Sequence, residues 1–358
     1  MRFRPGFFLA FLVFLLSFPI AAAEYTDGAL RLVLDEEAGR FSLYSLRHLN
    51  NQNRPLALFV DQDNRTSFLS VMVNDRFYKM GDSSTFRTRL EGNERNPSLI
   101  FESSFMLVTQ KFFFVRSSDS AETNGVFIRI TLENRGDRQI STGARFLLDT
   151  NLGEGQTDFS FSTNQKSIAS ETLLSATDGD MFWTDRNDNV SLVGSLFTGS
   201  SEEPDNVHFA NWKKLSDVSW KAPYQAGRNF NFPPYSVGDS ALCYYFEPRP
   251  LNRGDTRSFG FYLFLNSEKG FISPRSDSNE ELIRDLPAQG STGTPYGNSS
   301  NPAVPMDPRE QDLAALSELM ARIDTLIVSG TATPEELAAL ELALNRLRAK
   351  YGSGVNLR

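Results

Sequence analysis

Hydrophobic and polar residues alternate along most of the chain between Tyr25 and Asn266. Residues 125–136, "GVFIRITLENRG", show the pattern most clearly, because one face of an extended chain there carries Val126, Ile128, Ile130 and Leu132. Successive side chains of a β-strand point to opposite faces, so a period of two indicates a strand with one buried face. Similar segments, rich in β-branched and aromatic residues, recur up to "RSFGFYLFLN" at 257–266.

Short polar turns separate these predicted strands. Residues 29–46 predict two strands around the turn at 37–39, and residues 236–263 predict two more around "LNRGD". No amphipathic helix is predicted between Tyr25 and Asn266. Hairpin-length connections favour antiparallel sheets that pack face to face. The predicted fold is therefore mainly β, with one large antiparallel β-sandwich over residues 24–285.

The composition changes abruptly after residue 285. Residues 286–306 contain "PAQGSTGTPYGNSSNPAVP", in which Pro, Gly, Ser, Thr and Asn predominate. Such a segment has too little apolar surface to pack, so it is predicted to be a flexible linker. A helical segment at 307–352 and a tail at 353–358 follow it.

Residues 307–352 carry the start and stop signals of two helices. "DPRE" at 307–310 and "TPEE" at 333–336 each combine a capping residue, a proline and a glutamate. Apolar residues spaced three and four apart follow each signal, and Gly330 and Gly352 end the two patterns. The segment is predicted to form an α-helical hairpin. Two short helices bury too little surface to be stable alone, so the hairpin must dock.

The residues predicted to contact a docking partner are Leu313, Leu319, Leu326, Leu340 and Leu344. The linker allows the hairpin to reach away from the sandwich. We therefore expect it to bind a protein of the periplasm or cell envelope, or a second copy of this chain. The sequence leaves open the alternative that the hairpin docks on the sandwich of its own chain.

The first 23 residues have the features of a signal peptide. Arg2 and Arg4 precede an apolar run at 7–20, and Ala21–Ala23 offers a cleavage site before Glu24. The run is too short to span a membrane, and no second candidate span follows. Cys243, the single cysteine, lies far from the cleavage site, which excludes lipid attachment there. We expect a mature chain without a transmembrane segment, in the periplasm or secreted.

The net charge is −8, with basic residues scattered along the chain. This makes nucleic acid an improbable partner, because nucleic-acid-binding proteins concentrate positive charge on one face. The 30 phenylalanines indicate a large apolar core, and the length suffices for one large domain with an appendage.

The segment "RFLLDTNLGEG" at 145–155 places Asp149 and Thr150 where a predicted strand meets a glycine-rich turn. With the preceding strand it is predicted to form a hairpin around the turn at 134–137. The strand "I-x-L-x-N-x-G" followed by "R-x-L-L-D-T-x-L-G" resembles exported sandwich proteins of the galactose-mutarotase and glycosidase supersandwich group. "NWKKLSDVSW" at 211–220 fits the same picture. In that group the Asp-Thr pair is a strand-end feature, and this interpretation is favoured over a catalytic Asp149.

The resemblance implies chemistry on sugars, but the sequence offers few recognisable catalytic residues for it. Mutarotases use paired histidines with a carboxylate, whereas this chain has His48 and His208, both expected to be surface or edge residues. Glycosidases need two facing carboxylates, which 44 acidic residues cannot single out. No catalytic residue is assigned, and a non-catalytic protein is favoured over an enzyme.

No cofactor or metal site is predicted. Residues 185–189, "DRNDN", begin like a calcium loop, but Val190 stands where an EF-hand has glycine and Leu196 where it has glutamate. The acidic segments 178–180 and 61–64 are equally typical of solvated turns. A calcium ion stays open as an unproven alternative, while one cysteine and two histidines exclude a Cys/His cluster.

The best candidate binding segment is 211–239, an aromatic region with little strand periodicity. Long irregular loops are often functional, and aromatic rings stack on sugars or partner side chains. The alternative is that these rings cover the sandwich as a second core. The candidate binding residues are Trp212, Trp220, Tyr224, Tyr235 and Asp149.

Two functions follow from these observations. The favoured one is a non-catalytic binding or scaffolding protein of the periplasm or envelope, which docks a protein partner through the hairpin. The alternative is a carbohydrate-binding module or a sugar-active enzyme of the epimerase or glycosidase type. It would use the sandwich face and the aromatic segment 211–239.

The hairpin supplies a first test. Replacing Leu340 and Leu344 by Asp places two charges in its apolar seam, each costing several kcal/mol if it stays buried. We expect the double variant to lose partner capture or self-association, measured by pull-down and light scattering, while the sandwich keeps its melting temperature. Unchanged capture and oligomeric state with a demonstrably melted hairpin would contradict the docking role.

Overall fold

The structure is a computed structural model that describes residues 22–265 except 51, 61–63, 118, 151, 153–160, 199–201 and 231–238. The chain divides into two units, residues 1–291 and 292–358, and all the described residues belong to the first. The predicted sandwich end at residue 285, the linker and the hairpin lie outside them. Within the described residues the fold is mainly β, as predicted, and every strand pairing is antiparallel.

The described strands form three sheets. The four-stranded sheet has the order β1 (Ala23–Asp27), β2 (Leu30–Asp35), β3 (Arg40–Leu49), β4 (Pro55–Ala57). The eight-stranded sheet has the order β12 (Ser162–Thr163), β14 (Phe182–Arg186), β15 (Ser191–Ser195), β18 (Thr256–Leu265), β10 (Gly125–Asn134), β9 (Met106–Val115), β8 (Pro97–Glu102), β7 (Arg87–Gly92). The six-stranded sheet has the order β13 (Thr172–Ser175), β16 (Asn206–Asn211), β17 (Ser240–Leu251), β11 (Ile140–Leu148), β5 (Phe68–Val73), β6 (Arg76–Lys79).

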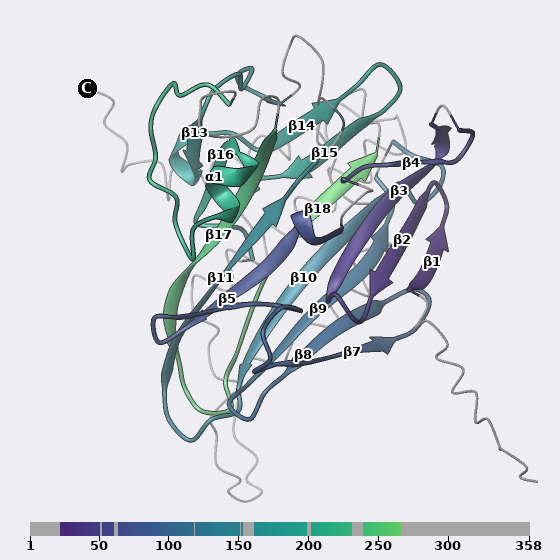
Figure 1. The fold of residues 1–358 in the computed structure, drawn as a ribbon. Helices are drawn as coiled ribbons and strands as arrows, with labels where there is room; N and C mark the ends of the chain where they lie inside the picture. Colours follow the sequence, from purple (N-terminus) through teal and green to yellow (C-terminus); the bar gives the residue numbers. More distant parts are fainter. Residues whose placement is uncertain are drawn as a thin grey trace, which may run out of the picture. The chain divides into compact units, whose positions relative to one another are not determined.

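The helical elements are short. They are η1 (Asn64–Thr66), η2 (Ala176–Asp178) and α1 (Trp212–Ser216), which lies beside β16 and β17 (Figure 1). The sequence predicted no amphipathic helix among the strands, and the short helix α1 was not foreseen. The Asn211 side chain accepts hydrogen bonds from the backbone N–H groups of Lys213 and Lys214 and so caps the helix. A five-residue helix is too short to show a helical period in the sequence. None of the helices in the described part of the chain is long and apolar enough to cross a membrane.

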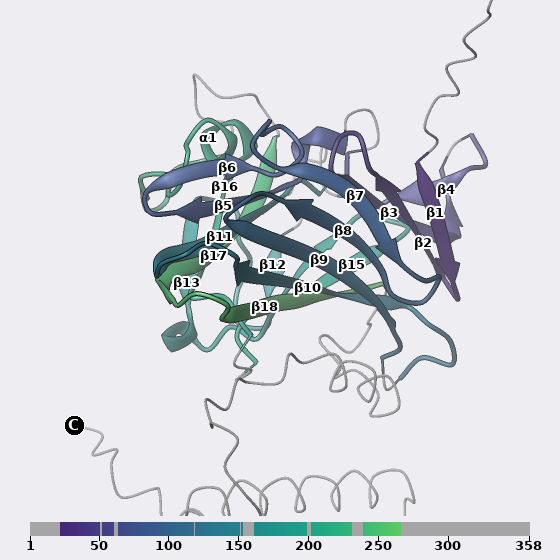
Figure 2. The same cartoon turned by 90° about the horizontal axis from the view of Figure 1, so that it is seen from below.

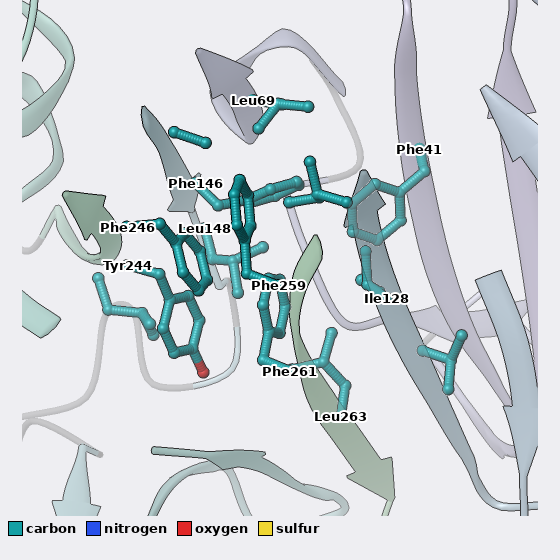
Figure 3. Close-up of a cluster of buried hydrophobic side chains, with 14 of the residues drawn as sticks. Phe41, Leu69, Ile128, Phe146, Leu148, Tyr244, Phe246, Phe259, Phe261 and Leu263 are labelled. Atoms are coloured by element: carbon teal, nitrogen blue, oxygen red, sulfur yellow. The ribbon is translucent and has the colours of Figure 1, made fainter. Parts of the chain in front are cut away.

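The three sheets share one apolar core. The predicted inward face of β10 faces this core, because Val126, Ile128, Ile130 and Leu132 are fully buried. Residues of β3, β5, β11, β17 and β18 meet them in the same cluster (Figure 3). The views in Figures 1 and 2 place the four-stranded sheet beside the other two.

The hairpin predicted around the turn at 134–137 is a connection between two sheets, and the predicted turn "LNRGD" is another. The turn at 134–137 joins β10 to β11, and "LNRGD" joins β17 to β18, but each pair is divided between the eight-stranded and six-stranded sheets. Turn residues indicate a chain reversal without indicating whether the flanking strands pair or face each other. By contrast, the predicted turn at 37–39 joins β2 and β3 as a true hairpin, with Gly39 at a φ of +63°.

Aromatic rings join β17 and β18 across the interface between the sheets. Tyr244 stacks on Phe261 with centroids 4.4 Å apart, and Phe246 stacks on Phe259 at 4.2 Å (Figure 3). The Tyr244 hydroxyl accepts a hydrogen bond from the Trp183 indole at 2.5 Å. It donates one to the Ser195 carbonyl at 2.9 Å. This polar chain links β17 to β14 and β15 inside an otherwise apolar core.

Gly194 on β15 gives a test of this packing. A Cβ at this position would lie 2.2 Å from the Trp183 ring, which is fully buried and hydrogen-bonded. We expect Gly194→Ala to lower the free energy of unfolding by about 1–3 kcal/mol through overpacking, measured by urea denaturation. Gly136→Ala is the control, because the nearest atom to its Cβ would be the Asn134 side-chain oxygen, at 3.2 Å. Equal stability of the two variants would contradict the tight approach of Gly194 to Trp183.

Candidate functional site

Residues 212–230, here called the cover segment, lie on the outer face of the six-stranded sheet. Leu215 and Ala222 of this segment form a second apolar cluster with outer-face residues of β11, β16 and β17. The outer-face residues of this cluster on those three strands are Leu147, Ala210, Ala241, Cys243 and Tyr245. The central strands of this sheet are therefore buried on both faces.

Arg145 of β11 holds the cover segment through its backbone. The side chain is fully buried, and its Nη2 donates a hydrogen bond to the carbonyl of Leu215 at 2.6 Å. Its Nη1 donates to the carbonyl of Val218 at 2.9 Å and to that of Trp220. Carbonyls at and beyond the end of a helix lack partners within the helix. A charged donor beneath them satisfies several at once.

Three ionisable side chains meet at the other end of the cover segment. Glu171 precedes β13, His208 lies on β16, and Lys214 lies on α1; they are only 3%, 1% and 5% exposed. The Lys214 ammonium is 2.7 and 2.6 Å from the two oxygens of Glu171. His208 Nε2 lies 3.0 Å from Oε1 of Glu171, and the backbone N–H of Gln225 donates to the same oxygen at 2.9 Å. One carboxylate therefore receives four hydrogen bonds.

This geometry sets the protonation of His208. A carboxylate only accepts hydrogen bonds, so Nε2 carries the proton and Nδ1 is the basic nitrogen. Burial lowers the pKa of His208; the hydrogen bond and charge of Glu171 oppose that shift, while the Lys214 charge adds to it. The imidazole is thus neutral at neutral pH, next to a Glu171–Lys214 ion pair.

A carboxylate-oriented imidazole is the arrangement that accepts protons in general-base catalysis. Here the ring is covered by Tyr224, whose ring meets it edge-on with centroids 5.8 Å apart and is itself 47% exposed. Glu171, His208 and Lys214 are each at most 5% exposed and so present almost no surface to solvent. The cluster therefore fastens the cover segment to the sheet in the structure as it stands.

The predicted binding residues are not gathered in one place. Trp212 is partly buried and its indole donates to the carbonyl of Thr66 at 2.9 Å. The Trp220 ring packs between Phe77 at 6.0 Å and Tyr245 at 6.1 Å. Both rings pack against the second core, which is the alternative role considered for them from the sequence.

Asp149 follows β11 and is 3% exposed. Its backbone N–H donates to the hydroxyl of Ser67, and its carbonyl accepts from the N–H of Val60. Tyr235 and the five docking leucines, Leu313, Leu319, Leu326, Leu340 and Leu344, lie outside the described residues.

The expectation that His208 is a surface or edge residue was wrong. Val207 and Phe209 face the core, so His208 faces outward, but the cover segment buries that side as well. His48 is partly exposed on β3. Glu171 and Lys214 were not singled out, because nothing local in the sequence marks a glutamate whose partners lie 37 and 43 residues away.

The acidic segments considered for calcium differ from their expected form. Asp178 is exposed at the end of η2, but Asp180 is fully buried with the Lys166 ammonium 3.6 Å away, and Asp185 is also buried. Within the described residues, no group of three His, Cys, Asp or Glu side chains could hold a metal ion. Of residues 61–64 only Asn64 is described.

 A hollow of about 370 Å³ lies on the outer face of the eight-stranded sheet at one edge. The hollow on the sheet is called the polar hollow here. It is lined by Arg89, Glu91, Gly92, Asn93, Asn96, Ser98, Ile100, Leu107, Thr109, Lys111 and Thr131.

Strand register brings these side chains together. Arg89 of β7 lies opposite Ile100 of β8, which lies opposite Thr109 of β9, which lies opposite Thr131 of β10. The four form one row across the sheet on a single face. A second row, two residues further along, contains Glu91, Ser98 and Lys111. The sequence pattern shows which face each side chain takes but not which strands are neighbours, so it could not predict this site.

The polar hollow combines hydrogen-bonding groups with an apolar part. Ile100 and Leu107 supply apolar surface among hydroxyl, amide and charged side chains. Arg89 is ion-paired with Glu91 and lies 3.7 Å from Glu102. The side-chain oxygen of Asn96 is buried and has no hydrogen-bond partner among the described residues, which leaves an acceptor at the hollow.

No protein-family model matches the chain, and no curated protein matches it. Solved structures that are similar include a galactose mutarotase-like protein from Lactobacillus casei, with 8% identity and a TM-score of 0.41 over 69% of this chain and 100% of that one. A galactose mutarotase related enzyme from Lactobacillus acidophilus has 8% identity and a TM-score of 0.39 over 70% and 99%.

An alpha-N-acetylgalactosaminidase from Bifidobacterium bifidum has 11% identity and a TM-score of 0.42 over 69% of this chain and 36% of that one. These solved structures belong to the group that the sequence motifs resemble. Matches at this level carry no residue role over to this chain.

Arg145 provides a test of how the cover segment is held. Replacing Arg145 by Met keeps an unbranched apolar side chain and removes the guanidinium that donates to the three carbonyls. We expect the free energy of unfolding to fall by about 2–5 kcal/mol, measured by urea denaturation. Arg249→Met is the control, because the Arg249 side chain is 61% exposed and its ion pair with Asp205 contributes little. Similar losses in both variants would contradict the role of Arg145.

Proposed function

We propose that this chain binds carbohydrate in the polar hollow across β7–β10. The observation that carries the proposal is the lining of the hollow, in which hydroxyl, amide and charged side chains surround the apolar surface of Ile100 and Leu107. A volume of about 370 Å³ falls in the range of small-molecule sites.

The chemistry of the lining suits a sugar ring. A sugar presents hydroxyl groups around its edge and C–H groups on its faces, so it needs hydrogen-bond partners beside an apolar patch. Thr109, Thr131 and Ser98 can both donate and accept, and the unpartnered Asn96 oxygen accepts. Leaving such an acceptor buried and unpaired costs free energy, and a ligand hydroxyl would recover it.

The residues that line the hollow support binding of a sugar there rather than its hydrolysis. Glycoside hydrolysis uses two carboxyl groups on opposite sides of the bond, and the lining supplies one carboxylate, Glu91. Glu91 is itself ion-paired with Arg89. This function corresponds to the alternative derived from the sequence, with the sandwich face as the binding surface.

Export and protein docking complete the proposal. A signal peptide at 1–23 would deliver the chain to the periplasm or the medium. The hairpin at 307–352 would attach the sugar-binding domain to an envelope protein or to a second copy. Both rest on the sequence patterns alone.

Sugar binding can be tested by filling the polar hollow with a larger side chain. Thr109 is partly exposed at its centre, so Thr109→Tyr places a ring where the ligand would lie without burying a new group in the core. We expect wild-type protein to bind members of an oligosaccharide array. Thr109→Tyr should weaken binding of the strongest of them at least about tenfold, or about 1.4 kcal/mol, measured by calorimetry.

The control is Thr26→Tyr, an exposed position on β1 outside the hollow, which should bind like wild type. Both variants should keep the wild-type melting temperature. Sugar binding that Thr109→Tyr leaves intact would place the site elsewhere. If the wild-type protein binds no oligosaccharide on the array, the proposed function is wrong.

A further inference from the structure

We propose that the cover segment is an acid-sensitive latch, which opens from the outer face of the six-stranded sheet when His208 takes up a proton. The proposal is independent of sugar binding, because the polar hollow lies on the eight-stranded sheet.

The cover segment has two polar attachments with different responses to pH. Arg145 binds the carbonyls of Leu215, Val218 and Trp220. Neither guanidinium nor carbonyl groups titrate between about pH 5 and 8. The other attachment joins Lys214 and the Gln225 N–H to Glu171, and His208 shares the same carboxylate. Only this second attachment contains a group that titrates in that range.

Charge balance at the cluster depends on a neutral His208. Glu171 and Lys214 carry one negative and one positive charge, so the buried cluster is neutral with a neutral imidazole. A protonated imidazole adds a second positive charge at a site where every member is at most 5% exposed. The uncharged Tyr224 lies against its ring, and uncharged Leu173 and Cys243 lie opposite it on β13 and β17. A buried excess charge is costly, and opening to water removes that cost.

The pKa of His208 gives the direction of the pH effect on cover opening and the pH range in which it occurs. In the closed state burial lowers the pKa of His208, while a solvated histidine has its ordinary value near about 6.5. The open state therefore binds the proton more tightly. The stability that a neutral His208 gives the closed cover is fully present above that ordinary value and is lost as the pH falls below it. Uptake of one proton changes the opening equilibrium by at most about tenfold per pH unit.

Cys243 is a built-in probe of this opening. It is the single cysteine of the chain, it is fully buried, and it lies directly opposite His208 in the β16–β17 register. It packs in the same cluster as Leu215 and Ala222 of the cover segment. A thiol reagent can therefore reach it only after the cover moves or the whole domain unfolds.

The experiment is maleimide labelling of the full chain between about pH 5 and 8, followed by mass spectrometry. Each rate is divided by the rate of glutathione at the same pH, which removes the reagent's own pH dependence. We expect the corrected rate to rise as the pH falls below the ordinary histidine value. His208→Gln keeps a side-chain N–H for Glu171 but cannot titrate, and its corrected rate should stay flat. His48→Gln, at the only other histidine, should behave like wild type.

Several outcomes would overturn the proposal. These are a flat wild-type rate, a pH dependence that survives in His208→Gln, or a rate no faster than global unfolding measured with urea at the same pH. If His208→Gln does not fold, a histidine NMR titration of the wild type decides. A His208 that titrates at or above the ordinary value overturns the latch, and one that titrates below it supports the latch.

Discussion

The central strands of the six-stranded sheet are buried on both faces, and this constraint shapes the surrounding structure. One face packs into the common core, so the other needs a second layer. The chain supplies it with 19 residues that include only one short helix. Such a layer cannot satisfy its own backbone groups, and each buried carbonyl or N–H must find a partner in the sheet below. Arg145, Glu171 and Asn211 are those partners.

Strand alternation made most of the β-fold predictable. It identified the inward face of β10 correctly, and it placed the strands that carry Arg145 and Cys243. It could not assign strands to sheets, since a four-residue turn can join two paired strands or two facing ones. The hairpin predicted around the turn at 134–137 was wrong for that reason.

The candidate sites were harder to predict from the sequence than the strands were. The polar hollow depends on which strands are neighbours, and β7–β10 contribute to it only through their register. The buried cluster depends on contacts over 37 and 43 residues, made by residue types that are ordinarily exposed. The aromatic segment 211–239 was predicted as a binding segment, but both of its tryptophans pack inward against the sheet.

The hydrogen-bonded chain of Trp183, Tyr244 and Ser195 has a consequence for how the two sheets are aligned. Apolar alternation alone tolerates a slip of two residues along a strand, because the same faces stay inward. Such a slip would leave the indole N–H and the phenol hydroxyl buried without partners. Every shifted alignment would carry this energetic penalty. Three hydrogen-bonded polar groups in an apolar core therefore select one alignment of the two sheets among several that bury the same apolar faces.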